Sequence, residues 1–157
     1  MRYLMKQHFW GRTEKFTIKD EEGRDCYFFE GKRLSINNMM TMYDGDGTPL
    51  LTISRKLLSL KPLYEIRRGD EVYATVQKDL TFFKDKFTLD LPGPNDIEIK
   101  GNMRERKYNF HRQGRKVASV SKRIGLTDTY NVDIDDDQDA ATLLATAVVI
   151  DMVSHDD

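Results

Sequence analysis

Cysteine is almost absent from this sequence. The single cysteine of the 157-residue chain, Cys26, excludes an internal disulfide framework and a zinc cluster built on cysteine ligands. Because Cys26 begins the apolar stretch CYFF, we expect a buried structural thiol. An excess of charge of one sign is also lacking, since 25 basic and 26 acidic residues leave a net charge of −1. No global field therefore draws the chain to nucleic acid or to a membrane.

The sequence also lacks an apolar run long enough to cross a bilayer. Its most apolar stretch is AATLLATAVVIDMV at residues 140–153, whereas a membrane-spanning helix needs about 20 residues. The first residues, MRYLMKQHFWGRTEKF, contain neither an uninterrupted apolar segment nor a small-residue cleavage site. We therefore expect a cytoplasmic protein without a transmembrane span, which could still contact a membrane from its surface.

Catalytic and metal-binding motifs are missing as well. No G-x-S-x-G motif is present, and none of the three histidines has a recognisable serine or cysteine partner. The spaced acids of residues 133–139 resemble a calcium loop, but its sixth and twelfth positions hold Gln138 and Leu144 instead of Gly and Glu. The sequence therefore predicts no catalytic residue, no metal site and no cofactor, and favours a protein that is not an enzyme.

What the sequence does contain is alternation of apolar and polar residues with a period of two. This pattern is typical of half-buried strands in an antiparallel sheet. It occurs at Phe16 and Ile18, at Tyr64 and Ile66, at Val72, Ala74 and Val76, at Phe87, Leu89 and Leu91, and at Tyr130, Val132 and Ile134. Turn sequences such as EG, DGDG, RGD, PGPN and QG separate the segments.

An internal repeat organises these segments. The stretch YEIRRGDEVYATVQK from Tyr64 resembles YNFHRQGRKVASVSK from Tyr108, and three weaker copies begin at Tyr3, Tyr27 and Ile97. The repeat amounts to six strand–loop–strand units, which predicts about twelve strands over residues 2–135. Short repeats of this kind indicate a closed or radially repeated sheet.

A helix that is apolar all round follows the last predicted strand, over about residues 137–153. Residues 135–137 provide N-cap candidates, and Asp139 adds negative charge to the first turn. Such a helix must be surrounded, and only the sheet can surround it. Pairing of two helices from separate chains, or a helix lying across an open sheet, are the alternatives. The residues expected at the centre of the barrel are Leu143, Leu144, Ala147, Val148 and Ile150.

Four segments resemble the LURP-one-related family. They are FTIKDEEGRD (16–25), LLSLKPLYEI (57–66), FFKDKFTLD (82–90) and TDTYNVDI (127–134), the last followed by the acidic cap and the apolar helix. The resemblance covers nearly the whole chain and looks like a compact prokaryotic member. It implies a fold similar to the tubby C-terminal domain and the phospholipid scramblases, which is a mainly β, twelve-stranded closed barrel around a hydrophobic C-terminal helix. We therefore expect one domain over residues 1–157.

The resemblance implies less about function. Tubby domains bind phosphoinositides through basic residues outside the barrel, and scramblases act on membrane lipids, but no phosphoinositide motif can be matched here. The charge distribution offers a separate hint, because basic residues crowd residues 100–123 and aspartates crowd residues 128–157. The candidate anion-binding residues are Arg104, Lys107, Arg115, Lys116 and Lys122. An ordinary solvated face, pairing with the acidic segment, is the favoured alternative.

These observations predict a binding or scaffold module that docks on an anionic phospholipid surface or on a protein partner. Two other functions stay open: a protein-interaction module without a lipid role, and a lipid-acting enzyme. Nucleic acid is not expected as a partner, because alternation points Tyr108 and Phe110 inward and leaves no stacking platform.

Overall fold

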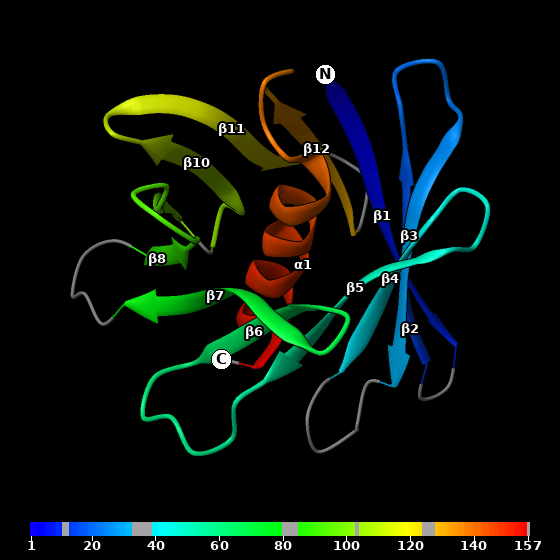
Figure 1. Ribbon diagram of the computed structural model, residues 1–157. Helices are drawn as coiled ribbons and strands as arrows, with labels where there is room; N and C mark the ends of the chain where they lie inside the picture. The colour runs from blue at the N-terminus through cyan, green and yellow to red at the C-terminus, as the bar shows by residue number, and fades with distance from the viewer. Residues whose placement is uncertain (11–12, 33–38, 80–84, 103, 124–127, 157) are drawn as a thin grey trace.

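The computed structural model (Figure 1) describes residues 1–10, 13–32, 39–79, 85–102, 104–123 and 128–156. These residues form twelve strands followed by one helix, α1 (Ala140–Asp156). The strands are β1 (Arg2–Trp10), β2 (Thr13–Lys19), β3 (Asp25–Lys32), β4 (Met40–Asp44), β5 (Pro49–Arg55), β6 (Leu63–Arg68), β7 (Glu71–Asp79), β8 (Asp85–Asp90), β9 (Ile97–Asn102), β10 (Lys107–Arg112), β11 (Arg115–Lys122) and β12 (Thr129–Ile134). Residues 82–84 and 127, at the edges of two family-like segments, lie outside the described residues.

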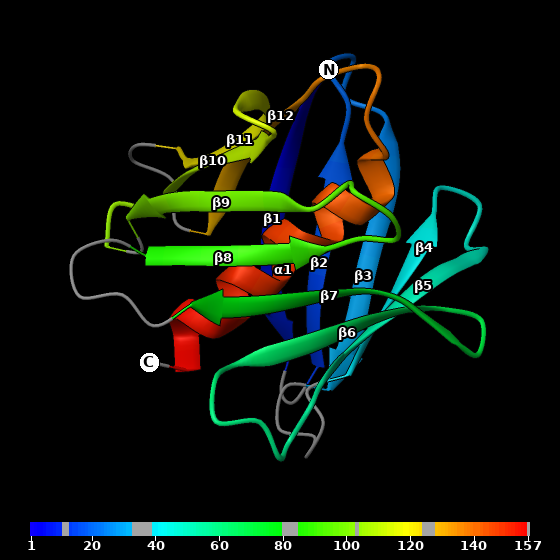
Figure 2. The ribbon, with the colours of Figure 1, turned by 60° about the vertical axis from the view of Figure 1, so that its left-hand side comes forward.

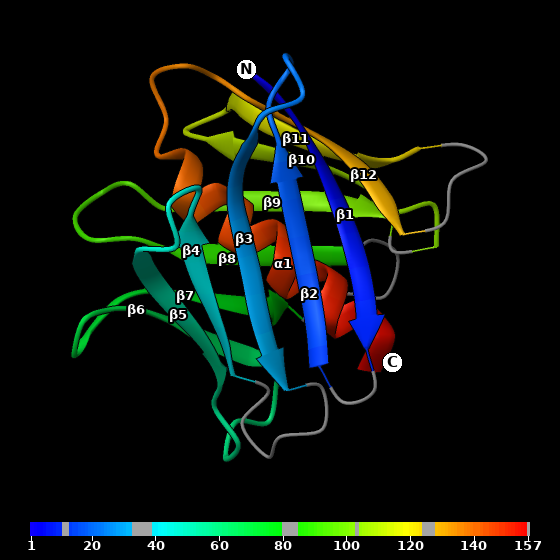
Figure 3. The same ribbon diagram turned by 90° about the vertical axis from the view of Figure 1, so that its right-hand side faces the viewer.

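The strands close into a single antiparallel barrel. Each pairs with its neighbours in the sequence, and β1 pairs with β12 to complete the ring. At this seam Tyr3 lies opposite Val132 and Met5 lies opposite Tyr130. Figure 3 shows β1 lying between β12 and β2. Closure leaves no exposed sheet edge, and it confirms the predicted twelve-stranded barrel.

Alternation along the strands fills the barrel, with exceptions at β-bulges. In β2, for example, Phe16 and Ile18 are fully buried while their neighbours are not. The prediction that Val72 points into the barrel is wrong, since its side chain is 43% exposed. A bulge shifts the β6–β7 register here, so that Arg67 pairs with Val72. Bulges insert an extra residue and disturb the inward–outward alternation.

Cys26 is likewise half-buried and not the buried thiol that was predicted. The β2–β3 pairing steps from Ile18 opposite Tyr27 to Lys19 opposite Asp25, which leaves Cys26 as the extra residue of a bulge. Its Sγ donates to the backbone oxygen of Arg24 at 3.5 Å. Partial burial, followed by the charge of Asp20, raises the pKa of this thiol, so it is a poor nucleophile at neutral pH.

Helix α1 runs inside the ring of strands (Figure 1) and is buried on all sides. Its buried positions include every residue that the sequence assigned to the centre: Leu143, Leu144, Ala147, Val148 and Ile150. Small residues such as Ala145 and Ala147 let the strands approach the helix. The surrounded helix accounts for the absence of a polar face.

The helix begins at Ala140 and ends at Asp156, three residues later at each end than predicted. Asp139 and not the preceding aspartates provides the N-cap, since its carboxylate accepts from the backbone N–H of Thr142 at 3.4 Å and from Thr142 Oγ1 at 2.7 Å. Residues 135–138 instead form a turn, with Gln138 N–H donating to the Asp135 carbonyl at 3.1 Å. Residues 135–139 contain four aspartates, any of which has the side chain of an N-cap, and Asp139 is the one that directly precedes the first helical residue.

Candidate functional site

The connections between strands divide into two sets at opposite ends of the barrel. Because consecutive strands are antiparallel, even-to-odd connections lie at the end where α1 begins, and odd-to-even connections lie where α1 ends. Figure 2 shows the β5–β6 and β9–β10 connections around the C-terminal end of α1. The two ends differ in charge, and the basic one is the candidate site.

The end where α1 begins is acidic, and we call it the acidic end. Its loops carry Asp20, Glu21, Glu22, Arg24, Asp46, Asp70, Asp96, Asp135, Asp136, Asp137 and Asp139. Cations at neighbouring strand ends pair with these acids. Arg115, for example, lies 3.5 Å from Asp135 and 3.1 Å from Asp137. The acidic end is therefore internally paired, with acids still in excess.

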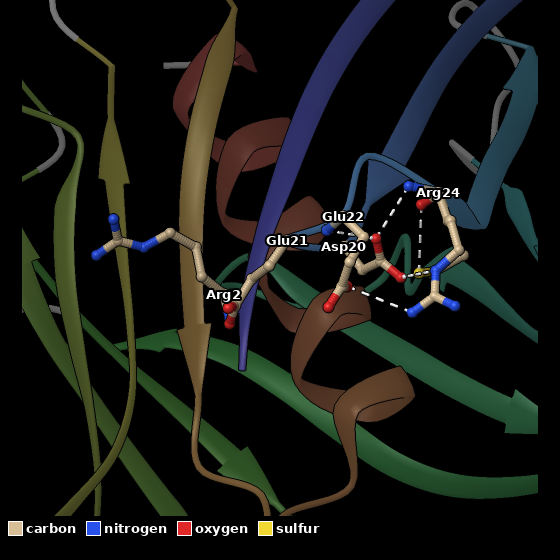
Figure 4. Close-up of polar contacts among 6 residues, drawn as sticks. Arg2, Asp20, Glu21, Glu22 and Arg24 are labelled. Carbon is tan, nitrogen blue, oxygen red and sulfur yellow. Dashed lines mark hydrogen bonds and ion pairs between the residues drawn. The ribbon is translucent and has the colours of Figure 1, made fainter.

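The β2–β3 loop shows how tightly these acids are held (Figure 4). The Asp20 carboxylate accepts hydrogen bonds from the backbone N–H groups of Glu22 and Arg24 and from Arg24 Nε, each at 2.9 Å. These bonds, above all the one from the Arg24 backbone, lower the pKa of Asp20 and keep it ionised. Glu21 accepts from the backbone N–H of Arg2 at 2.8 Å, so the loop is fixed against β1.

An open groove of about 930 Å³ lies beside this loop, over the outer face of β1 and β12. Its lining mixes cations and acids, and Arg2 pairs with Asp133 across it at 2.8 Å. No serine, cysteine or histidine is found among its described lining residues. The groove therefore offers a nucleophilic mechanism no reacting group.

The opposite end, where α1 ends, is basic, and we call it the basic end. The charged residues on the described part of its connections are Lys56, Lys61, Arg104, Glu105, Arg106, Arg123 and Asp128, and those at the adjoining ends of the strands and of α1 are Lys32, Arg55, Lys107, Lys122, Asp79, Asp85 and Asp156. Among described residues Lys56, Arg104, Lys107 and Lys122 are exposed and form no ion pair with one another or with a neighbour. These cations remain available for an anionic partner.

The predicted anion-binding residues divide between the two ends. Arg104, Lys107 and Lys122 lie at the basic end, where β9 passes into β10 and where β11 finishes. Arg115 and Lys116 lie at the opposite end of β11, about 20 Å away at 3.3 Å for each strand residue. The five residues therefore do not share one face. They were grouped because they are close in sequence, but β11 runs from one end of the barrel to the other and places them at opposite ends.

Two lysines of the basic end, Lys56 and Lys61, were missed. They flank the exposed leucines of the β5–β6 connection. From the sequence, this segment contributed only to the family resemblance. The signal was present in the sequence KLLSLK, where leucines that fit no strand alternation stand between two lysines.

A buried polar cluster lies just inside the basic end. Arg106 Nη1 lies 3.2 Å from Asp151 Oδ1 of α1, and the Tyr130 hydroxyl donates to the same oxygen at 2.6 Å. Arg106 adopts φ 55° in the β9–β10 connection, and its side chain contacts Tyr130 and Asp151. Burial, followed by the Asp151 charge, raises the pKa of Tyr130. Because the Asp151 side chain is only 3% exposed, the cluster joins the helix to the barrel and does not present a surface.

Two further searches bear on possible ligands. Within the described ranges, no three His, Cys, Asp or Glu side chains are grouped as a metal ion would require. The acids that resembled a calcium loop have other partners: Asp133 pairs with Arg2, Asp135 and Asp137 pair with Arg115, and Asp139 caps α1. In the part of the chain that the structure describes, no helix is long and apolar enough to span a bilayer.

Comparisons with known proteins agree on one family. The sequence model of the LURP-one-related family matches residues 1–151. The uncharacterized protein YxjI of Bacillus subtilis (strain 168) is 32% identical over 98% of this chain and 94% of its own length. Protein LURP-one-related 15 of Arabidopsis thaliana is 23% identical over 90% of this chain and 74% of its own length.

The fold has been seen in an X-ray structure of a protein from Arabidopsis thaliana. That structure superposes with a TM-score of 0.69 over 97% of this chain and 91% of the other, at 18% identity. At this identity the likeness concerns the fold alone. Together with the family match over residues 1–151, these findings show that the chain belongs to the LURP-one-related family.

Proposed function

We propose that this protein is a non-enzymatic binding module that docks end-on to an anionic phospholipid surface through the basic end of its barrel. One observation carries the proposal: the charge of a nearly neutral chain is divided between two ends, and one of them has exposed lysines and an arginine that form no ion pair with any described residue. A planar anionic surface attracts the basic end and repels the acidic end, so the protein is oriented as well as bound.

The expected affinity is modest. A Lys or Arg close to an anionic membrane contributes about 1 kcal/mol. The five cations Lys56, Lys61, Arg104, Lys107 and Lys122 would together provide weak, reversible binding. Salt screens such interactions, since the Debye length falls from about 10 Å at 0.1 M to about 3 Å at 1 M.

A binding role fits the site better than catalysis does. Of the basic-end cations only Arg123 is among the described lining residues of the groove on the β1–β12 face, and that lining includes no serine, cysteine or histidine. Cations on an outer rim can attract a charged surface but cannot by themselves activate a bond. A protein partner with an acidic face remains the second candidate, because the same cations would attract it.

Co-sedimentation with phosphatidylcholine vesicles of graded phosphatidylserine content, at low and high salt, tests the proposal. We expect binding that rises with phosphatidylserine and falls with salt. Lys122→Glu should weaken it about tenfold or more. Lys116→Glu is the matched control, because it makes the same charge change on the same strand at the acidic end and should bind like the wild type. Binding that ignores phosphatidylserine, or equal losses in both variants, would overturn the proposal.

A further inference from the structure

The β5–β6 connection presents bare leucine side chains to solvent. Leu58 is 97% exposed, Leu60 is 104% exposed and Leu57 is 54% exposed. Single exposed apolar residues are normal on protein surfaces, but three within four positions form a patch that needs an explanation. These three side chains are not part of the buried core of the barrel.

The base of this loop is held in place. Lys56 donates its backbone N–H to the Leu63 carbonyl at 2.8 Å, and Lys78 of β7 donates to the Pro62 carbonyl at 3.0 Å. These bonds fasten both ends of residues 56–62 to the sheet, while the leucines between them stand away from it. Figure 2 shows the loop projecting beyond the strands at the basic end.

We propose that this leucine loop, residues 56–62, is an apolar anchor that inserts into the interfacial region of an anionic bilayer. The inference rests on the proposed function and deepens it, since the loop belongs to the same basic end. Lys56 and Lys61 bracket the leucines, and no acidic residue lies between Arg55 and Leu63. Lysines in this position can keep their ammonium groups among the phosphates while the leucines enter the acyl region.

The chemistry favours a bilayer over a protein groove. The exposed leucines lie on a projecting loop between two lysines, and a bilayer accepts such a loop without a complementary pocket. Weak electrostatic attraction alone anchors a protein poorly, whereas attraction combined with buried apolar surface gives stable yet reversible binding. At the basic end both contributions act in the same direction.

A fluorescent probe at the loop tip tests the insertion directly. Leu58→Cys in a Cys26→Ser background is labelled with an environment-sensitive fluorophore and mixed with phosphatidylcholine vesicles, with and without phosphatidylserine. We expect a blue shift on binding and quenching by lipids that carry a quencher on the acyl chain. Asp46→Cys, in the β4–β5 turn of the acidic end, is the matched control and should stay in water.

The outcomes separate this inference from the proposed function. Binding to anionic vesicles with an unshifted Leu58 probe overturns the anchor and leaves electrostatic docking in place. A shifted probe on neutral vesicles, equal with and without phosphatidylserine, supports the anchor and overturns the anionic preference. Absence of binding to every vesicle overturns both, and a protein partner then becomes the occupant to seek.

A second variant tests the energetics of the loop. Leu58→Ser with Leu60→Ser should fold like the wild type, because both side chains are exposed. We expect vesicle binding at high salt to fall on the order of tenfold for each leucine removed from hydrocarbon. Unchanged binding, or conversion of a wild-type dimer into a monomer with unchanged vesicle binding, would overturn the anchor.

Discussion

At the scale of single residues, the Arg106–Asp151 pair links the barrel to its helix. Asp151 places a carboxylate among the buried residues of α1, at a position that is 5% exposed. Desolvating a carboxylate is costly, and Arg106 with the Tyr130 hydroxyl offsets that cost by hydrogen bonding its Oδ1. The pair therefore ties the C-terminal part of α1 to the β9–β10 connection.

Removing one partner of the Arg106–Asp151 pair should lower the stability of the fold. Asp151→Ala leaves the half-buried Arg106 guanidinium without its counter-charge, so we expect a loss of about 3 kcal/mol in the free energy of unfolding. Urea unfolding measures it. Arg106→Met combined with Asp151→Leu should be less destabilised than Asp151→Ala alone, because no buried charge is left unpaired. A single variant as stable as the wild type would show that the pair has no such role.

Removal of the buried Tyr108 hydroxyl should have a smaller effect on stability. Its hydroxyl is buried without a hydrogen-bond partner among the described residues, and burial, followed by the Asp85 charge, raises its pKa. Tyr108→Phe should therefore change stability at neutral pH by no more than about 1 kcal/mol. The ring itself should stay, because it packs edge-on against Phe87 with centroids 6.1 Å apart.

Tyr108→Phe should also alter how stability changes with pH under alkaline conditions. A buried tyrosine keeps its proton in the folded state above pH 10, whereas the unfolded chain releases it near its ordinary pKa of 10.0. Above pH 10 the unfolded state therefore binds fewer protons, and stability falls as pH rises. Urea unfolding between pH 8 and 11 should show a shallower decline in Tyr108→Phe than in the wild type, and equal slopes would contradict the buried phenol.

At the scale of elements, the central helix decides whether the barrel can form. Leu144 and Val148 are fully buried one turn apart, so Leu144→Asp or Val148→Asp would place an unpaired charge inside the barrel. We expect both variants to be insoluble or unfolded. Leu144→Met conserves volume and should cost less than about 1.5 kcal/mol. Circular dichroism melting checks all three, and an aspartate variant that melts like the wild type would contradict the central position of α1.

The start of the helix depends on Asp139. Its carboxylate caps Thr142 and also pairs with Arg68 at 2.5 Å. Asp139→Ala should reduce the free energy of unfolding by about 1 kcal/mol, as loss of an N-cap does. Asp137→Ala is the comparison, because Asp137 makes an exposed ion pair with Arg115 that is worth little. Equal effects in the two variants would argue against Asp139 as the cap.

At the scale of the whole molecule, closure of the sheet separates the charges of a nearly neutral chain into an acidic end and a basic end. Each connection falls at one end or the other, so charges scattered through the sequence collect on two opposite rims. Hydrogen exchange on phosphatidylserine-containing vesicles should therefore protect residues 56–62 and 104–107 and leave residues 20–24 and 135–139 as they are in solution. Protection at the acidic end, or evenly over the barrel, would contradict end-on docking.

The architecture could be predicted from the sequence because its signals are local. Alternation at Phe16 and Ile18 and an apolar helix at residues 140–153 each report burial, and burial of a helix on all sides requires a surrounding sheet. The exceptions, Val72 and Cys26, lie at bulges, where one extra residue changes the face without leaving a mark on the pattern.

The grouping of the charged residues was decided only by the tertiary structure. Arg115 and Lys122 are seven positions apart in one strand, yet they stand at opposite ends of the barrel. Lys56 and Lys122 are far apart in sequence, yet they share the basic end. The sequence by itself determined most of the buried positions and that the sheet must enclose the helix, because apolar alternation and an apolar helix are local patterns; Val72 and Cys26 are the exceptions. It did not determine the surface, because a surface is assembled from loops that only the closed barrel brings together.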